Sequence, residues 1–121
     1  MLAIEDLNLK YGQSQILTGI TLNAPVGQVT CVTGTNGVGK TSLLKAIAGR
    51  HPFSGGSITL DGTAIPPGRA AVAARSGVGY VPQGREIFPL MTVKENLETG
   101  FACLPKSEHK IPDDIFDLFP V

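Results

Sequence analysis

The sequence predicts an α/β fold in which an antiparallel β subdomain precedes part of a parallel sheet core. Three features carry this prediction: alternating apolar residues near the N-terminus, a compact β-branched run at residues 29–33, and a glycine-rich loop that leads directly into a helical pattern. Apolar residues at every second position are typical of strands with one buried face, whereas an unbroken apolar run suits a strand covered on both faces. The chain has 121 residues, 42% of them hydrophobic, which suits one domain or part of a larger one.

The N-terminal segment, residues 2–24, is expected to form two antiparallel strands. Its apolar residues recur at every second position, with a break in the register near Asp6 and a turn at Gly12. Residues 25–27, Pro-Val-Gly, end the second strand. Residues 29–33 then predict the buried strand that precedes the glycine-rich loop.

The rest of the chain predicts six further elements. Asp61-Gly62 is typical of a tight hairpin turn, and Thr92 with Glu95 matches a capping box at the start of a helix. The elements are a helix ended by Gly49, a hairpin over residues 55–65, a short helix over 70–75, a strand over 78–81 stopped by Pro82, a helix from Thr92 to about Phe101, and a helix over 113–119.

Charge and cysteine content restrict the class of protein. Ten basic and ten acidic residues give a net charge of zero, which argues against binding nucleic acid through bulk positive charge. Cys31 and Cys103 match neither a disulfide framework nor a metal spacing, so we expect two small buried hydrophobes in a reducing compartment. The acidic start and the absence of a long apolar stretch favour a cytoplasmic chain that can still dock on a membrane protein.

The segment that predicts phosphate binding is residues 34–41, GTNGVGKT, which fits the pattern GxxxxGK[ST]. Glycines let the backbone amides turn toward a phosphate, and the following helix adds its free amides and positive dipole end. Lys40 can reach the β- and γ-phosphates, and the Thr41 hydroxyl can bind Mg²⁺. The alternative, a glycine-rich turn that only caps a helix, is disfavoured by the strand and helix patterns around it. The candidate nucleotide-binding residues are Gly34, Thr35, Asn36, Gly37, Val38, Gly39, Lys40, Thr41 and Ser42.

Through these residues the chain resembles the ATP-binding subunits of ABC (ATP-binding cassette) transporters, which have a P-loop NTPase fold. Tyr11 resembles the A-loop aromatic residue that stacks on adenine, although alone it would be read as a strand-edge tyrosine. Residues 78–83, VGYVPQ, resemble the strand and Q-loop of that family. The resemblance implies that Gln83 contacts Mg²⁺ and the attacking water, whereas an isolated glutamine would be a solvent-facing loop residue.

Residues 84–97 and 115–120 resemble the branch of importers for branched-chain amino acids and urea. Gln83 stands where amino-acid members often carry Glu, so the urea type is the nearer likeness. The resemblance implies ATP and Mg²⁺ as cofactors, a second ATP-binding subunit, and a location on the inner face of the cell membrane. It also implies permease subunits docked at about residues 84–91, with Arg85, Phe88 and Met91 at the contact; the alternative is an ordinary, partly apolar loop.

The family's signature motif, its acidic strand with the catalytic Glu, and its switch histidine are not found in this sequence. His51 and His109 are interpreted as surface loop residues, and Glu95 as a helix cap. We therefore interpret residues 1–121 as the N-terminal part of one nucleotide-binding domain: P-loop 34–41, Q-loop region 82–91, start of the helical subdomain 92–121.

This interpretation has consequences for activity and stability. The chain alone is expected to lack ATPase activity, with no residue assigned as catalytic beyond a contact of Gln83 with water. Unpaired strand edges predict a marginally stable or self-associating chain. Two other functions stay open: a soluble ABC ATPase of translation or repair, and a nucleotide-binding fragment without turnover.

Overall fold

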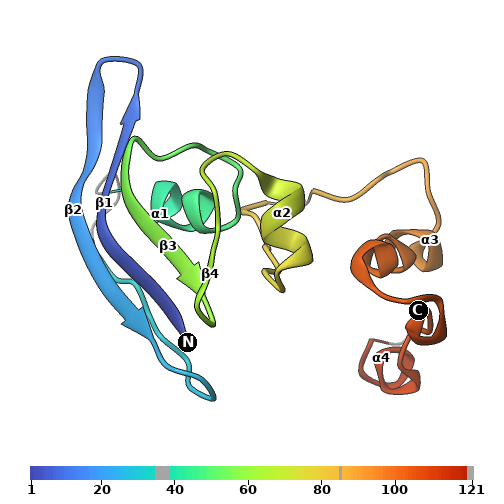
Figure 1. Cartoon of the computed structure of the whole chain (residues 1–121). Helices are drawn as coiled ribbons and strands as arrows, with labels where there is room; N and C mark the ends of the chain where they lie inside the picture. Colours follow the sequence, from blue (N-terminus) through green and yellow to red (C-terminus); the bar gives the residue numbers. More distant parts are fainter. Residues whose placement is uncertain (35–38, 85, 120–121) are drawn as a thin grey trace. The chain divides into compact units, whose positions relative to one another are not determined.

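The computed structural model describes residues 1–34, 39–84 and 86–119 (Figure 1). The chain divides into two compact units, Met1–Tyr80 (unit 1) and Val81–Val121 (unit 2). Unit 1 contains β1 (Leu2–Tyr11), β2 (Ser14–Ala24), α1 (Lys40–Ile47), β3 (Gly55–Leu60), β4 (Thr63–Ala64) and α2 (Ala70–Arg75).

The sheet of unit 1 has the strand order β2-β1-β3-β4, and all of its pairings are antiparallel. The register of β1 shifts between Ile4 and Leu7, where Asp6 has a positive φ of 48°. The extra residue lets Ile4 and Leu7, which are an odd number of positions apart, both face the core. The predicted antiparallel pair and its break near Asp6 are therefore confirmed.

The β3–β4 hairpin turns at Asp61 and Gly62, as the sequence predicts. Both residues have positive φ, 49° and 81°. A two-residue turn of this kind twists in the same sense as the strands that it joins, and it needs residues that tolerate the left-handed region.

Both helices of unit 1 contribute to one hydrophobic core. Leu43 and Ala46 of α1 and Ala73 of α2 cluster with strand residues, and Ala46 and Ala73 have no solvent exposure. The predicted helix ended by Gly49 and the short helix over residues 70–75 are confirmed. The fully buried strand side chains of this core are Ile4, Leu7, Leu9 and Ile58.

The predicted strands at residues 29–33 and 78–81 are wrong for this structure. Neither segment pairs with a strand in the described part of the chain, and Val29 and Val81 are 92% and 93% exposed. Strand structure requires a hydrogen-bonded neighbour, and the four strands among the described residues pair only with one another. The structure thus shows the antiparallel subdomain and no parallel pairing among the described residues. Cys31, expected to be buried in the first of these strands, is exposed instead.

Unit 2 consists of short helical segments: α3 (Val93–Glu98), η1 (Thr99–Cys103), η2 (Lys106–Glu108) and α4 (Asp113–Leu118). The capping box is confirmed, because the Glu95 amide donates to Thr92 Oγ1 at 3.1 Å and the Thr92 amide donates to Glu95 Oε1 at 3.0 Å. The α-helix ends at Glu98 and continues as a 3₁₀-helix, so the prediction of a helix to about Phe101 is correct in extent and wrong in type beyond residue 98. The predicted helix near residue 113 is confirmed.

Cys103 is exposed, contrary to expectation, because none of the described residues of unit 2 is buried enough to form a core around it. Among the described residues, no helix has the length and apolar character needed to span a bilayer.

Candidate nucleotide-binding site

The start of α1 explains the glycine at position 39. Gly39 is the N-cap of the helix, and its φ of 95° lies in the left-handed region. A Cβ placed on it would lie 2.7 Å from Leu17 Cδ2 of β2, which is closer than side chains tolerate. Gly39 is therefore needed both for its backbone conformation and for the close approach of the chain to the sheet.

The first turn of α1 is electrostatically suited to an anion. The first helical hydrogen bond runs from the Leu43 amide to the Gly39 carbonyl at 2.9 Å, so the preceding amides have no acceptor within the helix. The first turn contains no acidic residue and Gly39 provides no side-chain cap, which leaves the positive end of the dipole uncompensated by the helix itself.

The Lys40 ammonium group lies close to the other end of the glycine-rich segment. Lys40 Nζ donates a hydrogen bond to the Gly34 carbonyl, so both ends of the segment are within reach of one positive charge. Lys40 is half-buried and Thr41 is exposed. The other predicted residues of the loop, Thr35, Asn36, Gly37 and Val38, lie outside the described residues.

Tyr11 and Ser42 come from distant parts of the sequence and meet at the first turn of α1. Ser42 Oγ donates to the Tyr11 hydroxyl at 3.4 Å, a long hydrogen bond. Ser42 is the buried polar residue of this region, only 8% exposed, whereas Tyr11 at the end of β1 is 41% exposed. The structure thus brings together two of the residues that the sequence nominates for nucleotide binding.

His51 is a neighbour of Tyr11 that sequence reasoning missed. It is a partly exposed loop residue, as predicted, but its ring centroid lies 4.2 Å from that of Tyr11 at an interplanar angle of 36°. Its Nε2 lies 3.0 Å from the Lys10 carbonyl oxygen. The contact follows from the pairing of β1 with β3, which brings residues 51–54 alongside the end of β1. No local sequence pattern predicts the contact of His51 with Tyr11.

Gln83 is exposed and belongs to unit 2, whereas Thr41 belongs to unit 1. Their predicted cooperation at Mg²⁺ therefore remains a prediction. Their amide and hydroxyl oxygens are the hard donors that Mg²⁺ prefers. In the parts of the chain that the structure describes, no group of three or more His, Cys, Asp or Glu residues could hold a metal ion.

The predicted docking segment, residues 84–91, is described in unit 2 except for Arg85. Ile87, Phe88 and Leu90 are 65%, 55% and 100% exposed. Asn96 organises this loop: its Oδ1 accepts from the Phe88 amide at 2.8 Å, and its Nδ2 donates to the Phe88, Met91 and Thr92 carbonyls at 3.1, 3.3 and 2.8 Å. The loop is thus held by hydrogen bonds while its apolar side chains face outward.

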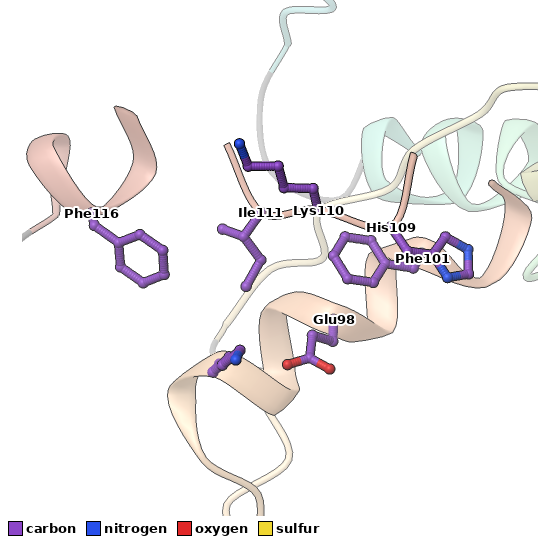
Figure 2. A pocket seen from close by; sticks show the side chains of 7 residues that line it. Glu98, Phe101, His109, Lys110, Ile111 and Phe116 are labelled. Atoms are coloured by element: carbon purple, nitrogen blue, oxygen red, sulfur yellow. The ribbon is translucent and has the colours of Figure 1, made fainter. Parts of the chain in front are cut away.

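Unit 2 also contains an open pocket of about 460 Å³ (Figure 2). The rings of Phe101 and His109 stack at its side, with centroids 5.1 Å apart and an interplanar angle of 11°. His109 is otherwise the exposed loop residue that the sequence predicts. The pocket contains none of the predicted site residues; it is lined by Lys94, Glu98, Phe101, His109, Lys110, Ile111 and Phe116.

Comparison with known protein families matches residues 17–118 to the ABC transporter family. The match covers more than half of the chain. The chain belongs to the ABC transporter family. Within this family, it is 30% identical over 121 residues to the high-affinity branched-chain amino acid transport ATP-binding protein BraG of Pseudomonas aeruginosa.

Other relatives have different printed substrates. The chain is 37% identical over 107 residues to the sulfate/thiosulfate import ATP-binding protein CysA of Neisseria meningitidis, and 40% identical over 100 residues to the Fe(3+) ions import ATP-binding protein FbpC of Mesorhizobium japonicum. These alignments cover 99%, 88% and 82% of this chain for BraG, CysA and FbpC. The chain spans 52% of the length of BraG, 29% of CysA and 28% of FbpC.

Proposed function

We propose that this chain is the nucleotide-binding part of an ATP-binding subunit of an ABC importer, which couples ATP binding and hydrolysis to solute uptake. The observation that carries the proposal is the meeting of Tyr11 and Ser42 at the first turn of α1. It puts an aromatic ring of the kind that stacks on bases beside a helix terminus of the kind that binds phosphates. The import or transport names of the relatives favour this role over one in translation or repair.

In this proposal the phosphates are bound by residues 34–42. The amides of the first turn of α1 and the Lys40 ammonium offset the negative charge of the phosphate tail. For this, Lys40 Nζ exchanges its hydrogen bond to the Gly34 carbonyl for phosphate oxygens. Thr41 and Gln83 are the proposed Mg²⁺ ligands, and the ion, when bound, further neutralises the phosphates.

Hydrolysis needs a group that orients water and more positive charge on the transition state than residues 34–42 supply. We assign no general base within this sequence. The proposal therefore gives ATP binding to the 121-residue chain and turnover to a complete pair of ATP-binding subunits.

The proposed partners are permease subunits that contact residues 84–91 on the cytoplasmic side of the membrane. The outward-facing Phe88 and Leu90 and the half-buried Met91 support such a contact, because exposed apolar side chains gathered on one loop are typical of interaction surfaces. For the solute we propose a branched-chain amino acid or urea. The likeness to BraG supports the former, and Gln83 with residues 84–97 supports the latter.

Replacing Lys40 with Ala tests the proposed phosphate grip. Hydrogen bonds to charged groups contribute about 1.5–3 kcal/mol, so the Kd for Mg·ATP should rise by at least about tenfold in isothermal titration calorimetry. Lys45→Ala, in the last turn of the same helix, is the matched control and should leave the affinity within about twofold of the wild type. Equal affinities of Lys40→Ala and wild type would refute the assigned role of Lys40.

A further inference from the structure

The contact between His51 and Tyr11 constrains an aromatic ring that the proposed function assigns to adenine. The ring centroids are 4.2 Å apart, so His51 covers part of the tyrosine ring. Tyr11 nevertheless remains 41% exposed, which leaves ring surface open to a ligand. A role for His51 at this ring rests on the proposed function, because it concerns how that site recognises the base.

The hydrogen bond of His51 to the Lys10 carbonyl fixes the orientation of the imidazole ring. A carbonyl oxygen only accepts hydrogen bonds, so the Nε2 atom 3.0 Å from the Lys10 oxygen must carry a proton and donate. Lys10 directly precedes Tyr11. One side chain therefore holds both the backbone next to Tyr11 and the tyrosine ring.

Tyr11 is consequently held at three points. Its backbone pairs with Ser14 across the β1–β2 turn, its hydroxyl accepts from Ser42 Oγ, and its ring contacts His51. The first two points leave the ring free to turn about the bonds that connect it to the backbone and hydroxyl, whereas a neighbouring ring restricts that rotation. Fixing a ring before a ligand arrives lowers the entropy cost of binding.

We propose that His51 is a positioning residue that orients the Tyr11 ring for stacking on a purine base. His51 then contributes to the affinity for the base and not to the affinity for the triphosphate, which residues 34–42 bind. Stacking of a base on an aromatic side chain typically accounts for about a 5- to 150-fold change in affinity. Loss of positioning alone should remove a part of this, about three- to tenfold.

The test measures base and phosphate binding separately. The chain contains two tyrosines and no tryptophan, so a Tyr80→Phe background leaves Tyr11 as the sole tyrosine whose emission reports ligand stacking. Tyr80 faces the Arg50 guanidinium through its ring, and Phe preserves that ring. In this background Mg·ATP and inorganic triphosphate with Mg²⁺ are titrated, by calorimetry and by tyrosine emission.

Three substitutions of His51 separate the ring contact from the hydrogen bond. His51→Ala removes both, His51→Gln keeps a donor for the Lys10 carbonyl without a ring, and His51→Phe keeps a ring without the donor. We expect His51→Ala and His51→Gln to weaken ATP binding about three- to tenfold, to leave inorganic triphosphate unchanged, and to reduce the quenching of Tyr11 by ATP. His51→Phe should restore most of the ATP affinity. Circular dichroism identifies the variants that fold, and each folded variant is judged on its own.

Several outcomes would overturn the inference. Equal losses for ATP and inorganic triphosphate would show that His51 acts only on the general structure of the site. Unchanged ATP affinity in His51→Ala or His51→Gln would show that Tyr11 needs no support from His51. A wild-type chain that binds both ligands with equal affinity would remove base stacking while keeping the phosphate grip. A wild-type chain that binds neither would remove the proposed function together with the inference.

Discussion

Unit 1 and unit 2 are stabilised in different ways. All of the buried hydrophobic residues identified in the described part of the chain belong to unit 1, where strands and helices distant in sequence share one core. Unit 2 has no buried residue among those described, and the hydrogen bonds described above for it join residues at most eight positions apart. Unit 1 thus depends on burial of apolar area, and unit 2 on capping and loop hydrogen bonds.

The difference matches the tasks that we propose for the two units. A phosphate grip requires amides and an ammonium group held in fixed positions, and Gly39 packs directly against Leu17 of the sheet. A loop that meets a partner keeps its apolar side chains outward and needs only local order. Elements with few buried contacts open most readily, so we expect the loop at residues 86–91 to open more readily than the sheet.

The largest expected effect comes from removing a core side chain of unit 1. Leu9 has no solvent exposure, so Leu9→Ala should lower the free energy of unfolding by about 2–5 kcal/mol. Leu90, the fully exposed leucine of unit 2, is the matched control, and Leu90→Ala should change it by less than about 0.5 kcal/mol. Urea unfolding followed by far-ultraviolet circular dichroism measures both, because Leu9 lies in unit 1, Leu90 lies in unit 2, and both units contain helix. Similar losses for the two variants would contradict the comparison.

A smaller effect is expected from truncating Asn96, whose side chain makes the hydrogen bonds that hold the loop at residues 86–91 of unit 2. Asn96→Ala deletes four hydrogen bonds, and because the Phe88 amide is exposed, water replaces its acceptor, so the local cost should be about 0.5–1.5 kcal/mol. Hydrogen exchange of that amide should accelerate by about 2- to 13-fold, while the core amides of β1 keep their protection. Asn23→Ala on the exposed side of β2 serves as the control. Loss of protection across unit 1 in Asn96→Ala would show that the two units are not stabilised separately.

The elements that could be predicted from sequence are those encoded by neighbouring residues. Asp61-Gly62 specifies its turn, Thr92 and Glu95 specify a helix start, and the odd spacing of Ile4 and Leu7 specifies a bulge. In each case the determining groups lie within a few residues of one another. Local hydrogen bonds and backbone preferences therefore decide the structure.

The predictions that proved wrong concern structure that depends on residues distant in the sequence. The β-branched run at residues 29–33 has strand propensity, but propensity alone does not provide a pairing strand, and Cys31 is exposed as a result. The site shows the same limit. Its glycines and Lys40 are visible as a pattern, whereas the contact of His51 with Tyr11 depends on the register between β1 and β3.

The smallest expected effect is the pH dependence of α3. Hydrogen bonds from the Thr92 backbone and side chain lower the pKa of Glu95 below its ordinary value. A group with a lowered folded-state pKa contributes stability that is complete above its unfolded-state pKa and is lost as the pH falls through the folded-state value. Acidification through that window should therefore reduce the helicity of α3, as followed by ¹³Cα chemical shifts of residues 93–98. Glu95→Gln keeps an oxygen acceptor for the Thr92 amide but does not titrate, so its helicity should change less over the same window. If Glu95→Gln lost helicity in parallel with the wild type, another group would be responsible, and the capping box would not be the source of pH-dependent order in unit 2.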